Sequence, residues 1–311
     1  MKYSVLIILF ALFFVSCTKD QLPDPDACRD LITPSGIHLG PVYINDLPYY
    51  SSPCFNPNNE EEIIYLGADG LDTFKLYKLN LKTNERSEIL EGLIYPIPRW
   101  SVKDWIIFSK SDFNVYKIKS NGDSLTQLTD SGNCFGPVWN KEGNSFIYHE
   151  GFTTPTRGIV CEEDGLVIDT IIGVGQHNWP SWRHDSLIAY GDLLALLTVN
   201  PQTHEVDTIS RISISDAGFG GGVEWIDNEN IIWSYRKGIF KTNIKTKETT
   251  LLKESCTSSI YLSPTYSPQS GKLIYQRVDK FQRGEKAGKA VSKLYIMNVD
   301  ATDEKEIVIP E

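Results

Sequence analysis

The sequence has fewer basic than acidic residues and little helical character. Forty Asp and Glu against 30 Lys and Arg give the 311-residue chain a formal net charge of −10. Nucleic-acid binding needs a basic surface, so this balance argues against a nucleic-acid partner and against membrane contact made through charge. Beyond the N-terminal segment, no stretch of 11 or more residues carries the apolar period of an amphipathic helix. The chain is therefore expected to be all-β.

The common motifs of catalysis and metal binding are also missing. There is no GxSxG nucleophile elbow, and the five histidines form no HxH or HxxxH pair. The six cysteines show no CxxC spacing, which argues against a zinc or iron–sulfur site. We therefore predict no catalytic residue, no metal and no cofactor. In an oxidising compartment the cysteines would form one or two disulfides, and buried free thiols are the alternative.

The N-terminus reads as an export signal. Met1-Lys2 is followed by an apolar run over residues 5–15 and then by Ser16-Cys17. This order is typical of a secretory signal peptide, and the run is about half of the roughly 20 residues that a membrane-spanning helix needs. Residues 1–16 are therefore predicted to be removed. The polar, Pro-containing stretch that follows, up to residue 35, is predicted to be a tether.

Two short motifs around the predicted cleavage point carry a resemblance. Phe14-Val15-Ser16-Cys17 resembles the lipobox of bacterial lipoproteins, in which the cysteine is diacylated and becomes the new N-terminus. Thr18-Lys19-Asp20 resembles the signal that follows the lipidated cysteine in Bacteroidetes surface lipoproteins. The resemblance implies lipidation at Cys17 and attachment to the outer membrane, on its periplasmic face or at the cell surface. Contact with the membrane would be made through this lipid alone.

A repeat of about 43 residues dominates the rest of the chain. It is marked by a Pro-x-aromatic motif, in which the fifth copy has Val in place of Pro. The copies begin at Pro53, Pro98, Pro137, Pro180, Val223 and Pro264, in steps of 45, 39, 43, 43 and 41. Some ten to twelve residues after each start, an apolar run ends in an aromatic residue: Tyr65, Phe108, Tyr148, Tyr190, Trp233 and Tyr275. Two features that keep the same phase over six copies indicate six structural repeats.

Each repeat contains four short runs rich in Ile, Val, Tyr, Phe and Trp, separated by Gly, Asn, Asp and Pro. Such runs are typical of strands joined by hairpin turns. Four strands in about 40 residues is the pattern of a propeller blade. The sequence therefore predicts a six-bladed β-propeller of four-stranded antiparallel blades over residues 36–311, with blades starting near 51, 96, 135, 178, 221 and 262. The recurring aromatic residues are expected to fill the space between neighbouring sheets.

The repeat resembles that of TolB-like propellers. Pro137-Val138-Trp139 and the residues up to Tyr148 are similar to the P-x-W/F-S-P-D-G-K-x-I-A/Y-F/Y pattern of that family, and residues 264–275 fit it again. The resemblance covers nearly all of the chain after the tether, and it implies the fold without fixing an activity. TolB itself also has an N-terminal α/β domain, for which residues 18–50 are too few. A full role in the Tol system is therefore not implied.

The repeat phase suggests one ligand site. Positions three residues before each motif should form a ring at one mouth of the central funnel. They are Tyr50, Tyr95, Cys134, His177, Gly220 and Tyr261. Three tyrosines and a histidine, with Trp179 beside them, would make an amphipathic rim suited to a sugar or a peptide end. The alternative is that these side chains only plug the funnel or pack beneath loops.

Together these features predict a lipid-anchored, monomeric envelope propeller that binds an envelope protein or a glycan. The alternative function is that of a carbohydrate-active enzyme, a polysaccharide lyase or hydrolase, with its site in the funnel. Paired carboxylates or histidines in the funnel would favour the enzyme, whereas an aromatic or neutral funnel would favour binding. The sequence leaves open how the ring closes. Residues 37–44 are a candidate for an additional edge strand or a cover over one face.

Overall fold

The computed structural model describes residues 48–69, 74–92, 94, 97–151, 155–174, 180–183, 187–191, 195–211, 219–235, 237–256, 259–280 and 289–310. The predicted signal peptide, the tether with Cys17, and the stretch 37–44 lie outside these residues. So do Tyr95, His177 and Trp179 of the predicted rim.

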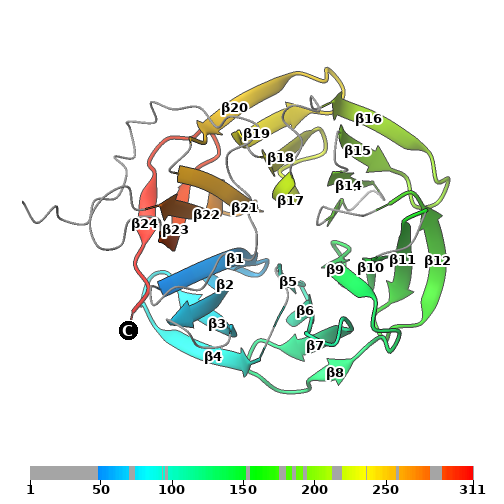
Figure 1. Cartoon of the computed structure of the whole chain (residues 1–311), viewed down its shortest axis with the longest axis horizontal. Coiled ribbons are helices and arrows are strands. Elements are labelled where there is room, and N and C mark those ends of the chain that lie inside the picture. Colours follow the sequence, from blue (N-terminus) through cyan, green and yellow to red (C-terminus); the bar gives the residue numbers. More distant parts are fainter. Residues whose placement is uncertain are drawn as a thin grey trace, which may run out of the picture.

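The described chain consists of antiparallel strands arranged in a ring (Figure 1). The first repeat contains β1 (Pro48–Asn56), β2 (Asn59–Asp69), β3 (Lys75–Asn80) and β4 (Arg86–Glu91). The second contains β5 (Arg99–Trp100), β6 (Trp105–Ser109), β7 (Val115–Lys119) and β8 (Thr126–Gln127). The third contains β9 (Cys134–Trp139), β10 (Ser145–Glu150), β11 (Arg157–Glu162) and β12 (Val167–Ile172).

The second half of the chain repeats this order. The fourth repeat contains β13 (Ser181–Trp182), β14 (Ile188–Gly191), β15 (Ala195–Val199) and β16 (Val206–Arg211). The fifth contains β17 (Phe219–Trp225), β18 (Asn230–Tyr235), β19 (Gly238–Asn243) and β20 (Thr249–Glu254). The sixth contains β21 (Ser259–Ser267), β22 (Lys272–Lys280), β23 (Ala290–Asn298) and β24 (Lys305–Ile307). In each repeat the chain runs outward, from a strand near the centre to one at the periphery (Figure 1).

The sheets differ in one respect from the prediction. Repeats two to five each form a separate four-stranded antiparallel sheet, as expected, whereas the strands of repeats six and one form a single eight-stranded sheet. Six separate sheets are therefore not found. The reason is a parallel bridge between Tyr49 of β1 and Ser292 of β23, which joins the two halves. The first and last repeats are thus joined through β1 and β23.

The Pro-x-aromatic motif lies at an irregularity of the innermost strand. Pairing with the next strand shifts between Ser51 and Cys54 in β1, and between Leu262 and Thr265 in β21. The residue before the motif has a positive φ in both, 53° at Ser52 and 51° at Ser263. Proline has no N–H to donate to a ladder, and a bulge is a position in a sheet that tolerates it. The bulge bends the strand where it reaches the centre of the ring.

The apolar core lies between neighbouring sheets. The recurring aromatic residues are all buried, from fully buried Tyr65 to Tyr148 at 6% exposure, so the prediction that they fill these spaces is confirmed. Tyr190, for example, packs in one cluster with Val138 and Ile147 of the third repeat. Each Å² of apolar surface removed from water stabilises the fold by about 25 cal/mol. Because the buried apolar side chains gather between neighbouring sheets, these contacts are the main source of stability.

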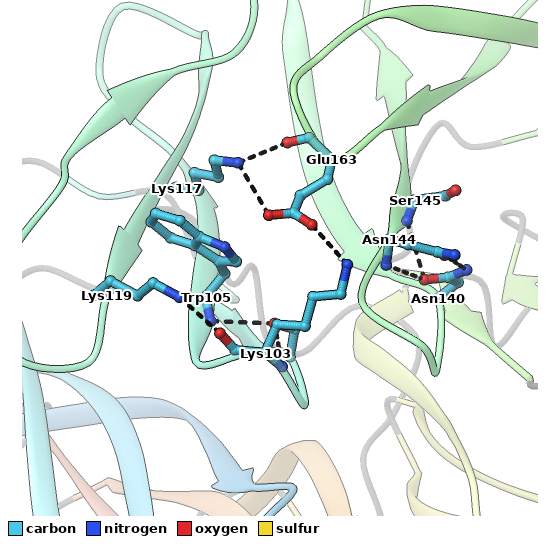
Figure 2. Close-up of polar contacts among 9 residues, drawn as sticks. Lys103, Trp105, Lys117, Lys119, Asn140, Asn144, Ser145 and Glu163 are labelled. Carbon is cyan, nitrogen blue, oxygen red and sulfur yellow. Dashed lines mark hydrogen bonds and ion pairs between the residues drawn. The ribbon is translucent and has the colours of Figure 1, made fainter.

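Polar contacts tie the sheets together further out. Glu163, in the turn between β11 and β12, reaches across to the second repeat (Figure 2). Its carboxylate accepts a hydrogen bond from Lys103 at 2.8 Å, and its carbonyl accepts one from Lys117 at 2.9 Å. Lys117 and Lys119 lie over the ring of Trp105, at 4.5 and 3.8 Å from its centroid. Both lysines stabilise this indole by cation–π contact. Because Lys103 and Lys117 also donate to Glu163 of the third repeat, the cluster links two neighbouring sheets.

Candidate functional site

A cavity of about 300 Å³ lies where the innermost strands of all six repeats meet. Each repeat contributes the second and third residues of its Pro-x-aromatic motif and residues that follow them. The middle positions of the motif, which we call the channel ring, are Cys54, Arg99, Val138, Ser181, Glu224 and Thr265. The aromatic positions, Phe55, Trp100, Trp139, Trp182, Trp225 and Tyr266, also line the cavity. The sequence repeat therefore brings six different side chains to one axial site.

The channel ring holds one cation and one carboxylate. The side chains of Arg99 and Glu224 are 7% and 23% exposed, and Arg99 Nη2 lies 4.0 Å from Glu224 Oε2. This separation is longer than a hydrogen bond. Both Arg99 Nη1 and Nη2 are buried, and neither has a hydrogen-bond partner among the described residues. The guanidinium is thus attracted to Glu224 without being hydrogen-bonded by it.

Burial controls the ionisation of the channel ring. It raises the pKa of Glu224 to about 7, against the opposing effect of the Arg99 charge and of a hydrogen bond with Ser181. Burial likewise raises the pKa of the Cys54 thiol, although Arg99 nearby favours the thiolate. At neutral pH the thiol is therefore protonated, whereas the Glu224 carboxyl is divided between its two forms. Arg99 is the one permanently charged group of the ring.

The walls of the cavity are held by hydrogen bonds. Trp225 donates its indole N–H to the carbonyl of Ser181 at 3.0 Å, and Trp100 donates its own to Asp104 at 3.0 Å. The guanidinium of Arg183 lies 4.5 Å from the centroid of the Trp225 ring and donates to the carbonyl of Asn228. These bonds fix the indoles in place, so the cavity is formed before any ligand arrives.

The described residues of the predicted rim are placed elsewhere. Tyr50 is half-buried in β1 and lies edge-to-face against Tyr65, with ring centroids 5.8 Å apart. Tyr261 in β21 is 3% exposed and packs against Tyr275, also at 5.8 Å. Neither residue lines the cavity. Tyr50 and Tyr261 thus pack in apolar clusters that join consecutive repeats, and the rim as a whole stays a prediction.

The channel ring was present in the sequence but was not singled out as a site. Its members are the variable residues inside the repeated motif, and two of them, Arg99 and Glu224, are charged residues within otherwise apolar surroundings. A charged residue at a position that is Cys, Val, Ser or Thr in the other repeats is a signal that could have pointed to the site.

Other site types were sought across the part of the chain that the structure describes. No three His, Cys, Asp or Glu side chains gather there as they would around a metal ion. None of these residues belongs to a helix with the length and hydrophobicity that membrane crossing requires. Cys54, Cys134 and Cys161 are free and buried, whereas Cys256 is disulfide-bonded.

Comparison with known proteins identifies the fold alone. No protein-family pattern matches the chain, and no curated protein matches it in sequence. Among solved structures, a putative TolB from Agrobacterium tumefaciens is 12% identical, with a TM-score of 0.58 over 74% of this chain and 86% of that one. The propeller domain of the trilobed protease from Pyrococcus furiosus, titled as having an open velcro topology, is 12% identical. Its TM-score is 0.52 over 85% of this chain and 96% of that one.

An oligogalacturonate lyase from Vibrio parahaemolyticus is 15% identical, with a TM-score of 0.51 over 92% of this chain and 83% of that one. These neighbours include a putative TolB, a domain of a protease and a lyase, so they share an architecture and not an activity. The chain is an all-β propeller built from four-stranded antiparallel blades, with a TolB-like fold.

Proposed function

We propose that this protein is a binding module that receives its ligand in the central cavity, and that it is not an enzyme. The observation that carries the proposal is the preformed cavity to which every repeat contributes. Six aromatic residues line it, and its carboxylates are Glu224 and Asp227. Asp227 is engaged in its own turn, where it accepts hydrogen bonds from the backbone of Glu229 and Asn230. A single available carboxyl among aromatic walls favours binding over catalysis.

The expected partner is an envelope protein or a glycan. Capture from the native envelope with wild-type and cavity-filling variants tests this. Val138→Trp fills the channel ring, and Lys141→Trp obstructs the mouth with an exposed residue that the fold tolerates. Leu166→Trp, on an exposed outer position at 60% exposure, is the matched control. We expect the partner to co-purify with wild-type and control protein and to be absent from both cavity variants. Recovery of the same partner by both folded cavity variants would refute the proposal.

The alternative function, a polysaccharide lyase or hydrolase acting in the same cavity, is favoured by one observation. A carboxyl with a pKa of about 7 is suited to proton transfer at neutral pH, and Glu224 is such a group. The alternative predicts cleavage of an envelope polysaccharide that Glu224→Gln abolishes. Binding of the polysaccharide without any cleavage at neutral pH would support the first function instead.

We also propose that the eight-stranded sheet is functionally two blades, which gives a six-bladed ring. Six apolar clusters support this count, because each one joins strands of two consecutive repeats, including the sixth and the first. A crystal structure of residues 36–311 tests the count. Six radially repeated sheets around one axis are expected, and any other number would contradict it.

The remaining proposals concern location. We propose a lipoprotein that is cleaved before Cys17, acylated there and anchored in the outer membrane as a monomer. The disulfide at Cys256 supports an oxidising compartment. Labelling cells with radioactive palmitate should mark the wild-type protein and leave Cys17→Ala unlabelled.

The predicted rim of Tyr50, Tyr95, His177, Trp179 and Tyr261 remains a second candidate contact, which Tyr95→Ala combined with Tyr261→Ala would test.

A further inference from the structure

The buried guanidinium of Arg99 lacks hydrogen-bond partners for its two terminal nitrogens, which is unusual in a folded protein. Arg99 is 5% exposed, and its two terminal nitrogens are buried without a hydrogen-bond partner among the described residues. Buried polar groups in folded proteins are almost always hydrogen-bonded, and a charged group left unpaired costs more than a neutral one. An arginine kept in this state at the centre of a preformed cavity points to a ligand that completes its hydrogen bonds.

The neighbours of Arg99 do not supply that partner. Glu224 lies 4.0 Å from Nη2, and Ser181 hydrogen-bonds to the same carboxyl. The thiol of Cys54 interacts with Arg99, but sulfur is a weak acceptor and the two terminal nitrogens stay without a partner among the described residues. Because burial favours the neutral form of Glu224, the charge of Arg99 is incompletely compensated near neutral pH. The cavity therefore carries a net positive charge at its ring and favours an anionic ligand group.

The planar fork of two N–H donors fits a carboxylate. Arginine binds carboxylates bidentately through parallel N–H···O bonds, and one guanidinium matches the single charge of a carboxylate. The described cavity residues include Arg99, Arg183 and Lys141 as cations. Arg183 is already bonded to Asn228 and stacked on Trp225, and Lys141 is exposed at the mouth. A phosphate dianion would find one available guanidinium at the ring.

The rest of the cavity favours an apolar chain over a sugar. Thr265 donates its hydroxyl to the carbonyl of Pro53, and the hydroxyl of Ser181 accepts a hydrogen bond from the backbone N–H of Trp225. At the mouth, Gln269 donates to the carbonyl of Pro57. These groups are used within the protein, so sugar hydroxyls would find few partners. Trp100, Trp139 and Trp225 are each less than 10% exposed, and only Trp182 and Tyr266 of the aromatic lining are partly exposed, so few ring faces are open for a sugar to stack on.

We infer that the channel ring binds the carboxylate at the end of an apolar chain, with Arg99 as its bidentate anchor. A peptide C-terminus ending in an apolar residue has this chemistry, and so does a short fatty acid. The inference rests on the proposed binding function and adds the ligand class to it.

Isothermal titration with two pairs of probes tests the ligand class. The peptide pair is N-acetyl-leucyl-leucine with a free carboxylate and the same peptide as its C-terminal amide. The lipid pair is octanoate and octanol. We expect one acid to bind while its neutral counterpart binds at least tenfold more weakly. Preference for the peptide acid identifies a peptide terminus, and preference for octanoate identifies a fatty acid. Equal binding of acid and neutral probes, or no binding by either acid, would overturn the inference.

Variants of the channel ring test the anchor. Arg99→Met keeps the volume and removes the charge, so acid binding should fall at least tenfold. Arg99→Lys keeps the charge without the fork and should lose less. Glu224→Gln removes a negative charge near the ligand and should tighten binding several-fold at pH 8. If Glu224→Gln bound the acid probe more weakly and Arg99→Met bound it as wild type does, the site would prefer a cationic ligand and the inference would be wrong.

Two further readouts separate the possible failures. Arg99→Met removes a buried charge whose terminal nitrogens lack hydrogen-bond partners, and the Glu224 carboxyl beside it can take up a proton, so at pH 6 the variant is expected to unfold at about the same temperature as wild type. Loss of binding without loss of stability identifies a ligand-binding role. If the native partner is lost from the cavity-filling variants but retained by Arg99→Met, the binding module stands and the carboxylate anchor falls. If all variants retain it, the proposed function falls as well.

Discussion

At the scale of single residues, Glu224 is the group of the channel ring that titrates near neutral pH. Burial raises its pKa from an ordinary 4.5 to about 7. Between these values the folded protein binds more protons than the unfolded chain, so the contribution of this residue to the free energy of unfolding falls as pH rises. Above pH 7 the loss is complete.

Glu224→Gln should remove this dependence, because glutamine does not titrate. Relative to wild type, the variant is expected to gain roughly 1–3 kcal/mol in free energy of unfolding between pH 5 and pH 8. Urea denaturation of both proteins across this range measures the difference, in which other titrating groups cancel. A constant difference between the two proteins would show that Glu224 has an ordinary pKa.

The sequence predicted the packing residues better than the residues of the candidate site. The aromatic positions recur in every repeat, because each wedge between sheets needs the same large side chain, and this regularity is visible in the sequence. The channel ring varies from repeat to repeat, so it left no recurring pattern. The predicted rim positions lie three residues before each motif, and in β1 the irregularity between Ser51 and Cys54 separates Tyr50 from the motif. A one-residue shift in a strand reverses which side chains face a given direction, and spacing alone does not reveal it.

At the scale of strands and turns, two glycines show how the backbone limits substitution. Gly238 opens β19 with a φ of 145°, and a Cβ atom there would lie 1.7 Å from the carbonyl oxygen of Lys253 on β20. Gly92, just after β4, has a similar φ of 138° but no atom within 4 Å of the same position. The pair separates the cost of the backbone conformation from the cost of a steric clash.

Gly92→Ala should cost about 1–3 kcal/mol, the usual range for a residue held in a disfavoured conformation. Gly238→Ala adds displacement of the neighbouring strand and is expected to cost about 4 kcal/mol or more. Chemical denaturation of the two variants measures both costs. Equal losses would mean that β20 moves freely away from β19.

The four strands of each repeat were predictable because short apolar runs alternate with turn residues, and the structure confirms four-stranded antiparallel blades. The boundaries were less predictable. In the sixth repeat, β23 begins at Ala290, four residues before the apolar run that starts at Leu294. Polar residues such as Ser292 and Lys293 extend this strand, because β22 provides backbone partners for them.

At the scale of the whole molecule, the contact between the first and last repeats decides whether the ring is closed. Ser292, which is fully buried, donates its hydroxyl to the carbonyl of Tyr50 at 2.6 Å and accepts a hydrogen bond from Gln276 at 2.9 Å. Thr265 and Gln269 donate to carbonyls of the first repeat, and Arg86 donates to the carbonyl of Pro310. These hydrogen bonds supplement the parallel bridge between Tyr49 and Ser292, and no pattern in the sequence predicted them.

Ser292→Ala removes two of these hydrogen bonds and leaves the Tyr50 carbonyl without this donor. We expect it to lower the free energy of unfolding by about 1–3 kcal/mol. Ser109→Ala is a matched control, because Ser109 is also buried but its hydroxyl has no partner among the described residues. The control should be neutral or slightly stabilising in thermal and urea unfolding. Similar effects of both substitutions would mean that the contact between the first and last repeats adds little to stability.

The order of strands has an evolutionary consequence. Each four-strand unit is made of consecutive strands, and the first and last units touch without exchanging one. A genetic event that deletes or duplicates a segment of one repeat length would therefore remove or add a complete unit and leave none half-built. Such a lineage could change the circumference of its ring in single steps, and with it the width of the axial opening.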